Sequence, residues 1–231
     1  MTLPLVLVPG MMCDARLFAP QTAILSARRA VHLAPISDYD TIADLAAEIL
    51  LHAPLRFALA GLSMGGIVAM EMVAQAPARV ARLALLDTNC RAEKPEVAAR
   101  RQPQIDKVRA GGLRQVMRDE MKPNYLADGP GREPVLELCL EMALGLGPDV
   151  FIRQSVALRH RPDQQETLKS VRVPTLILCG AEDRLCPVEG HELMRRLVPD
   201  STLAVIQGAG HMTTLERPQA TTLALRRWLE D

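Results

Sequence analysis

The stretch Ala60-Gly61-Leu62-Ser63-Met64-Gly65-Gly66 decides the fold of this chain. Residues 56–60 before it are typical of a short buried strand, and the apolar residues after it predict a helix that ends at Pro77. Ser63 is therefore expected on a tight turn between a strand and a helix. Glycine is required at positions 61 and 65 because a Cβ there would strike the neighbouring strand or helix. Such a turn holds the serine hydroxyl clear of its own backbone.

Strand-like and helix-like segments alternate along most of the chain. Apolar runs that predict strands lie at residues 3–8, 31–34, 56–60, 80–86, 175–179 and 202–206. Apolar and amphipathic segments that predict helices follow Asp14 and lie at residues 41–51, 64–76, 188–198 and 219–229. This alternation predicts an α/β fold in which a mostly parallel sheet of about six strands carries helices on both faces.

The pattern changes between about residues 93 and 163, where no strand-like run occurs. Amphipathic helical pieces are expected there, broken at Pro103, at Gly111-Gly112, in the loop 123–131 and at Gly145-Leu146-Gly147-Pro148. We therefore expect residues 1–92 and 164–231 to form one core. Residues 93–163 are expected to form a helical cap inserted over the sheet.

Composition argues against several classes of protein. Lys plus Arg and Asp plus Glu both number 27, so the formal net charge is zero and no global field favours nucleic acid or an anionic membrane. No apolar run is long enough to cross a bilayer, and the apolar residues 1–8 lack the basic flank of a signal peptide. The five cysteines are odd in number and have no metal-ligand spacing. We expect reduced thiols in a cytoplasmic protein, with no metal site.

Ser63 needs partners to become a nucleophile. A base must remove its proton, and a third group must fix the tautomer of that base. His211 follows the last predicted strand in a glycine-rich loop, from which an imidazole can reach across the sheet edge. Asp183 follows the strand at 175–179 and is the preferred third residue. Asp87, at the end of the strand 80–86, is the alternative acid, for which a turn or helix-cap role is the favoured interpretation.

The chain order Ser63, Asp183, His211 is the order found in α/β-hydrolases. This order, the nucleophile turn, Val8-Pro9-Gly10-Met11, residues 174–183 and residues 210–218 resemble the α/β-hydrolase superfamily over nearly the whole chain. Within that superfamily the chain is similar to small esterase-like members, which include pimeloyl-carrier methyl esterases and enol-lactone hydrolases. The resemblance implies that the family's amino-terminal pair of strands is missing here. Where family members often have His-Gly, this chain has Pro9-Gly10.

The developing oxyanion of the reaction needs two backbone N–H donors fixed in advance. One is expected from Met64, directly after the nucleophile and at a helix amino terminus, where the helix dipole favours negative charge. The resemblance implies that the second donor follows the first strand, which here is the N–H of Met11. Neither donor depends on the identity of its side chain.

Methionines flank these positions, and a basic cluster lies late in the predicted cap. The methionines indicate an adaptable apolar substrate pocket, with ordinary core filling as the alternative for each: Met12, Met212, Met121 and Met142. The basic cluster could bind a substrate carboxylate or a carrier phosphate, but a solvated helix face or a hinge salt bridge is favoured: Arg153, Arg159, His160 and Arg161.

These features predict a serine hydrolase that cleaves a small carboxylic ester through an acyl-enzyme, with no metal or organic cofactor. Thioester, enol-lactone or carbon–carbon bond hydrolysis, acyl transfer or lyase chemistry could use the same residues, and the fold does not decide among them. A non-catalytic small-molecule binding protein is a further alternative. The expected partner is a small molecule, and the sequence does not indicate an oligomeric state.

Overall fold

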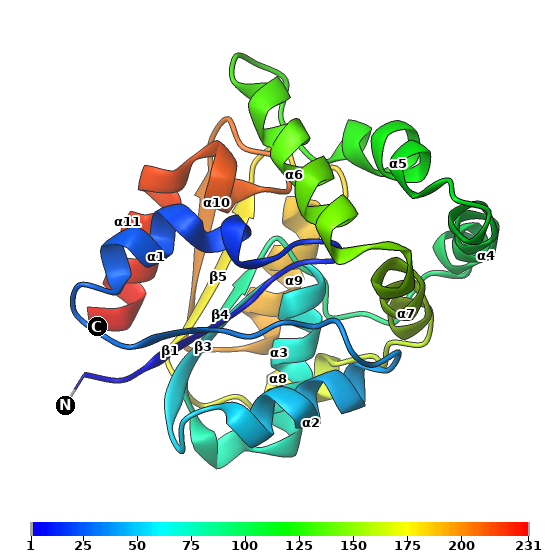
Figure 1. Cartoon of the computed structure of the whole chain (residues 1–231). Helices are drawn as coiled ribbons and strands as arrows, with labels where there is room; N and C mark the ends of the chain where they lie inside the picture. The colour runs from blue at the N-terminus through cyan, green and yellow to red at the C-terminus, as the bar shows by residue number, and fades with distance from the viewer. Residues whose placement is uncertain (1, 231) are drawn as a thin grey trace.

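The computed structural model describes residues 2–230 and contains a six-stranded sheet in the order β2-β1-β3-β4-β5-β6 (Figure 1). The strands are β1 (Leu5–Val8), β2 (Val31–Leu33), β3 (Phe57–Leu62), β4 (Val80–Leu86), β5 (Thr175–Gly180) and β6 (Ser201–Ile206). Each strand pairs with its neighbours in parallel. The predicted fold class and the predicted number of strands are confirmed.

Helices connect the strands, and several consecutive helices lie in the segment between β4 and β5. They are α1 (Ala19–Leu25), α2 (Ile42–His52), α3 (Met64–Gln75), α4 (Pro95–Arg109), α5 (Leu113–Gln115), α6 (Arg132–Leu146), α7 (Pro148–Arg159), α8 (Gln165–Ser170), α9 (Val188–Leu197), α10 (Thr213–Glu216) and α11 (Pro218–Glu230). Short 3-10 helices precede α1 (Ala15–Phe18), β4 (Pro77–Arg79) and the loop before α6 (Lys122–Asn124), and α5 continues into a π-helical segment, Val116–Met121. No helix within residues 2–230 has the length and apolarity needed to cross a membrane.

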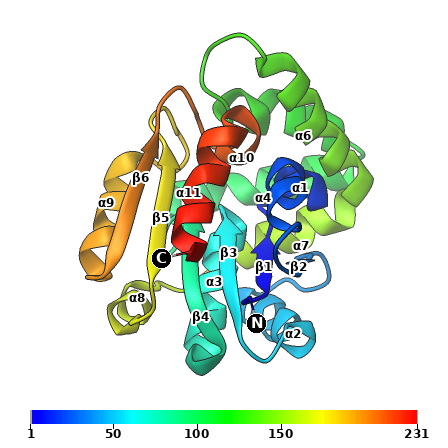
Figure 2. The same cartoon turned by 90° about the vertical axis from the view of Figure 1, so that its left-hand side faces the viewer.

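The central strands β1, β3, β4 and β5 are largely buried on both faces, and successive side chains of each strand point to opposite faces. On β1, Leu5 and Leu7 join a buried cluster with α1 and α11, whereas Val6 and Val8 join a second cluster with α2 and α3. Figure 2 shows α11 in front of the strands. This double burial explains why the strands appear in the sequence as continuous apolar runs.

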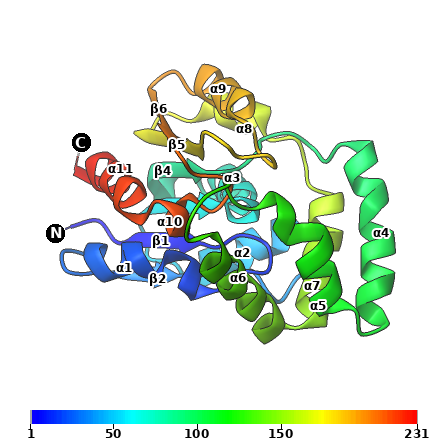
Figure 3. The same ribbon diagram turned by 90° about the horizontal axis from the view of Figure 1, so that it is seen from above.

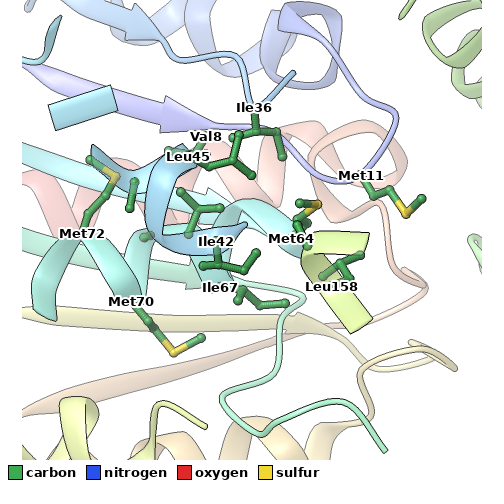
Figure 4. Close-up of a cluster of buried hydrophobic side chains, with 14 of the residues drawn as sticks. Val8, Met11, Ile36, Ile42, Leu45, Met64, Ile67, Met70, Met72 and Leu158 are labelled. Atoms are coloured by element: carbon green, nitrogen blue, oxygen red, sulfur yellow. The ribbon is translucent and has the colours of Figure 1, made fainter. Parts of the chain in front are cut away.

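The cluster on the α2 and α3 side is built from aliphatic side chains and methionines. Figure 4 shows Ile42 and Leu45 of α2 beside Ile67 of α3, with Met70 further along the same helix. Met70 is fully buried. This packing fixes α3, and with it the turn that carries Ser63 at the start of the helix.

The helices α4 to α7 lie together beyond the carboxyl ends of the strands (Figures 1 and 3). The prediction that Pro103 breaks a helix is wrong, since α4 continues through it. Proline removes one backbone donor and crowds the preceding turn, which normally interrupts a helix. Here Ile105 and Val108, which follow the proline, are buried, and α4 packs along α7. Tertiary packing therefore outweighs the local preference.

Candidate active site

Ser63 occupies a strained turn between β3 and α3. Its backbone has φ 55° and ψ −117°, which is unfavourable for a residue with a Cβ. A Cβ on Gly61 would lie 2.2 Å from the carbonyl oxygen of Gly65, and a Cβ on Gly65 would lie 2.1 Å from that of Val8. The Ser63 N–H donates to the Leu86 carbonyl oxygen at 2.9 Å. Close backbone packing and this hydrogen bond hold the half-buried serine in place on the turn.

The side chain of His211 lies between Ser63 and Asp183. Its Nδ1 is 2.8 Å from Oδ2 of Asp183, and its Nε2 is 2.8 Å from Oγ of Ser63. A carboxylate only accepts hydrogen bonds, so Nδ1–H donates to Asp183. In the neutral imidazole Nε2 is then free to accept the serine proton. The structure thus brings together the three side chains that the sequence singled out.

Asp183 is fixed in its orientation by the turn that follows it. Its Oδ1 accepts hydrogen bonds from the N–H groups of Leu185 at 2.8 Å and Cys186 at 2.9 Å. These two bonds leave Oδ2 to face His211. Both the Asp183 carboxylate and the His211 imidazole are buried. The buried carboxylate accepts the hydrogen bond from Nδ1–H and thereby holds the neutral imidazole in one tautomer.

The charge of Asp183 controls the protonation of His211. Burial lowers the pKa of His211, but the charge and hydrogen bond of Asp183, with smaller contributions from the charges of Asp87 and Glu216, outweigh burial and raise that pKa above its ordinary value. The imidazolium form is therefore favoured relative to a histidine in water. This is the electrostatic arrangement expected of a base that must hold a proton during a reaction.

Asp87 lies near this group, but its hydrogen bonds go elsewhere. Its Oδ1 accepts from the N–H of Gly180 at 2.9 Å, and its Oδ2 accepts from the hydroxyl of Thr213. Burial and then the charge of Asp183 raise the pKa of Asp87 well above its ordinary value. Through these bonds Asp87 ties the ends of β4 and β5 to the segment after His211.

The loop that carries His211 is fastened by Glu216, a residue whose role the sequence analysis missed. The Glu216 carboxylate accepts from the N–H groups of Gly210 and Met212, each at 3.0 Å, and from that of Ala127 at 2.8 Å. One carboxylate thus holds both sides of His211 and the loop before α6. A glutamate five residues after the histidine was visible in the sequence, but nothing indicated where it pointed.

The predicted oxyanion donors border the same cavity as Ser63. The cavity has a volume of about 680 Å³, and its wall includes Ser63, His211, Met11 and Met64. Met64 is the first residue of α3, so its N–H is one of those that an α-helix leaves without an internal acceptor. Met11 lies in the loop that follows β1.

The four methionines predicted to line a pocket divide into two pairs. Met121 and Met212 belong to the cavity wall. Met12 and Met142 do not, and both are buried in the core instead. Met12 has a left-handed backbone, φ 56°, and packs in the cluster with α2 and α3. Met142 lies on the inner face of α6 in the opposite cluster, so for these two residues ordinary core filling is correct.

The predicted basic cluster does not converge on one ligand position. Arg153 donates to the carbonyl oxygen of Ser37 at 2.8 Å, and Arg159 donates to Gln102 at 3.0 Å. Of the four residues, Arg161 alone is part of the cavity wall, where it forms an ion pair with Glu93 at 2.9 Å. Glu93 also pairs with Arg101, so this buried network joins the start and end of the segment 93–163, as expected of a hinge salt bridge.

Within the described residues, one cluster has the spacing of a metal site: Asp183, Cys186 and His211, whose ligand atoms lie within 4.8 Å of one another. Within this cluster His211 Nδ1 and Asp183 Oδ2 form a hydrogen bond with each other at 2.8 Å. Burial, followed by the charges of Asp183 and Asp87, raises the pKa of the Cys186 thiol well above its ordinary value. The three ligand atoms lie together because Asp183 bonds both to His211 and to the N–H of Cys186.

This architecture, with a serine on a strained strand-to-helix turn and a histidine after the last strand, defines the α/β-hydrolase class. The chain belongs to the alpha/beta hydrolase family, whose model matches residues 5–224. The predicted family and the prediction of a hydrolase are confirmed.

Relatives of known name support the same placement. The chain is 30% identical over 179 residues to a pimeloyl-[acyl-carrier protein] methyl ester esterase of Aromatoleum aromaticum, covering 69% of this chain and 68% of the relative. It is similar in structure to a thermophilic esterase from Thermogutta terrifontis, with a TM-score of 0.92, 30% identity and coverage of 100% and 90% of the two chains. The enol-lactonase from Burkholderia xenovorans LB400 gives a TM-score of 0.87, with 25% identity and coverage of 100% and 92%.

Proposed function

We propose that this protein is a serine esterase that cleaves a small carboxylic ester through a covalent acyl-enzyme. The observation that carries the proposal is the hydrogen-bonded chain from Ser63 through His211 to Asp183 at the wall of a large cavity. The names of the relatives, two esterases and an enol-lactonase, agree with acyl-oxygen cleavage. Enol-lactone hydrolysis is therefore the second candidate reaction.

In the proposed mechanism Ser63 Oγ attacks the ester carbonyl carbon while His211 Nε2 takes the hydroxyl proton. The tetrahedral intermediate collapses, and His211 returns that proton to the leaving alkoxide, which departs as an alcohol. Water then attacks the acyl-enzyme by the same route, with His211 again as base. Asp183 orients the imidazole and balances the imidazolium that forms in each half-reaction.

The N–H groups of Met64 and Met11 are proposed to bind the oxyanion of both tetrahedral intermediates. Support comes from the position of both residues in the cavity wall with Ser63 and from the place of Met64 at the start of α3, where a helix has no internal acceptor for the N–H. Donors of this kind act without reorganisation, and each is worth about 10²- to 10³-fold in kcat in serine hydrolases.

We propose that residues 93–163 act as a cap unit over the core formed by residues 1–92 and 164–231. Its helices lie beyond the carboxyl ends of the strands, and Met121 from this segment reaches the cavity wall. A small-molecule substrate suits a cavity of about 680 Å³. The five cysteines carry unpaired thiols, which supports a reducing compartment such as the cytoplasm.

Turnover of a substrate panel tests the proposal. Methyl esters, lactones, thioesters and diketones are compared with the parent protein and with Ser63→Ala, and products are identified by mass spectrometry. The proposal expects ester turnover by the parent and a loss of at least about 10³-fold in Ser63→Ala. Exclusive turnover of thioesters or diketones would replace the proposed substrate class, and no turnover of any compound would favour a binding protein.

A further inference from the structure

Gln154 of α7 is fully buried and bridges two loops of the core. Its Oε1 accepts a hydrogen bond from the N–H of Met12 at 2.8 Å, and its Nε2 donates to the carbonyl oxygen of Ile36 at 2.9 Å. The partners fix the orientation of the amide, because a backbone N–H only donates and a carbonyl oxygen only accepts. One side chain from the segment between β4 and β5 therefore holds both the loop after β1 and the loop after β2.

The loop after β1 needs such an external partner. Met12 has φ 56°, an unfavourable conformation for a residue with a side chain, and is almost completely buried. The loop is closed by a bond from the Cys13 N–H to the Gly10 carbonyl oxygen at 3.1 Å. Without Gln154 the N–H of Met12 would be buried and would lose its hydrogen-bond acceptor. Gln154 thus stabilises the strained conformation.

This loop also lies directly against Ser63. A Cβ built on Gly10 would lie 3.4 Å from the Cβ of Ser63, which places the backbone of the loop in contact distance of the serine. Met11, between Gly10 and Met12, belongs to the cavity wall. Any shift of the Met12 amide therefore moves the neighbouring Met11 N–H relative to Ser63.

We propose that Gln154 is a positioning residue, which holds the Met11 N–H in place for the oxyanion by binding the next amide in the chain. The proposal rests on the proposed esterase function. Gln154 is itself held firmly, because the preceding Arg153 fastens the same turn of α7 to Ser37 at 2.8 Å. Gln154 therefore makes the geometry of the oxyanion site depend on the position of α7.

Two substitutions separate positioning from simple packing. Gln154→Met keeps the length of the side chain but removes both hydrogen bonds. Gln154→Glu keeps an acceptor for the Met12 N–H, but its ionised form loses the donor to Ile36 and its protonated form costs free energy at neutral pH, so the fold is destabilised in either case. We expect Gln154→Met to lower kcat about 10- to 100-fold with KM within about threefold, as for an interaction made in the transition state. We expect Gln154→Glu to keep kcat within about fivefold of the parent despite a lower Tm.

Gln164 supplies the matched control. It is also a buried glutamine, and its Nε2 donates to Glu71 at 2.6 Å, away from the cavity wall. Gln164→Met is expected to lower Tm with kcat within about twofold of the parent. All assays are run on the full chain, at a temperature at which circular dichroism shows each variant folded.

The relative kcat values of Gln154→Met and Gln154→Glu decide whether Gln154 is a positioning residue. The proposal is supported if Gln154→Met loses kcat and Gln154→Glu retains it although its Tm is lower. It is overturned if Gln154→Met keeps the parent kcat, or if Gln154→Glu loses as much kcat as Gln154→Met. If Gln154→Glu does not fold, the comparison of kcat and KM between Gln154→Met and Gln164→Met decides. Ser63→Ala is assayed in the same experiment. If Ser63→Ala keeps the turnover of the parent, the esterase function itself is refuted. If Ser63→Ala loses turnover but Gln154→Met keeps the parent kcat, only the inference about Gln154 is refuted.

Discussion

Nε2 of His211 lies 2.8 Å from Oγ of Ser63, although the two residues are 148 positions apart in the chain. The contact joins the loop after β6 to the turn after β3, across two intervening strands. It is possible because parallel strands end at the same edge of the sheet, where their loops meet. A strained serine in contact with a base is the arrangement needed for an activated nucleophile.

Replacement of each of the two aspartates by asparagine tests which carboxylate orients His211. Asp183→Asn is expected to lower kcat by about 10³- to 10⁴-fold, because an amide in place of Oδ2 favours the wrong imidazole tautomer. Asp87→Asn is expected to stay within about tenfold of the parent, because an asparagine amide still accepts from Gly180 and tolerates the φ of 45°. Both variants are assayed at saturating substrate. A large loss in Asp87→Asn alone would reverse the assignment.

The pH dependence of kcat/KM is predicted from the raised pKa of His211. The neutral imidazole is the active base, so activity falls as the pH falls through a midpoint above the ordinary value of 6.5. Asp183→Asn removes the largest of the charges that raise this pKa, so the midpoint of the residual activity moves to lower pH. Rate profiles between about pH 5 and pH 9 measure both midpoints. If the midpoint of the fall in kcat/KM at low pH is the same in Asp183→Asn as in the parent, the charge of Asp183 does not raise the pKa of His211.

The raised pKa of His211 also affects the stability of the fold, which it lowers as the pH rises, whereas activity increases as the pH rises. Because the folded protein binds the His211 proton more tightly than the unfolded chain, this residue contributes stability that is fully present below the unfolded pKa. That contribution is lost as the pH rises through the raised folded pKa. His211→Ala should therefore show a smaller decline in stability over this interval than the parent, as measured by urea unfolding at several pH values.

Two glycine substitutions separate required from replaceable positions. Gly65→Ala would place a Cβ 2.1 Å from the carbonyl oxygen of Val8, so we expect a loss of about 3 kcal/mol or more in the free energy of unfolding. Gly145→Ala, inside α6, meets its nearest heavy atom only at 3.8 Å and should gain about 0.5 kcal/mol from the lower entropy of the unfolded chain. Chemical denaturation measures both, and equal stabilities would contradict the steric account of the turn.

The buried ion pairs of Glu93 predict a large effect of this residue on stability. The Glu93 side chain is 3% exposed, and its removal leaves the guanidinium groups of Arg101 and Arg161 without a countercharge. Glu93→Gln is expected to lower the free energy of unfolding by about 3 to 5 kcal/mol. Glu166→Gln is the control, because Glu166 is 85% exposed and its bond to Lys169 should contribute about 1 kcal/mol or less. Similar losses in the free energy of unfolding in both variants would show that the buried ion pairs of Glu93 stabilise the fold no more than an exposed ion pair does.

The strands and the grouping of Ser63, Asp183 and His211 could be predicted from the sequence for specific physical reasons. Strands buried on both faces appear as unbroken apolar runs, and β4 therefore has the bounds that the sequence predicts. Ser63, His211 and Asp183 each follow such a run, and parallel strands bring these positions to one edge.

The remaining parts of the site depend on contacts that no local pattern encodes. Gln154 acts through Met12 and Ile36, which lie 142 and 118 positions away, and Glu216 acts partly through Ala127, 89 positions away. The continuation of α4 through Pro103 likewise depends on packing against α7. Such contacts become visible only when the fold is known.

Labelling of the full chain with a fluorophosphonate, followed by mass spectrometry to locate the adduct, tests the central claim most directly. We expect a single adduct on Ser63. His211→Ala should abolish it, whereas His52→Ala, which changes an exposed histidine paired with Glu48, should leave it intact. An adduct on another residue, or equal labelling of Ser63 in His211→Ala, would contradict the claim that His211 activates Ser63. So would the absence of any adduct under conditions in which a known serine hydrolase reacts.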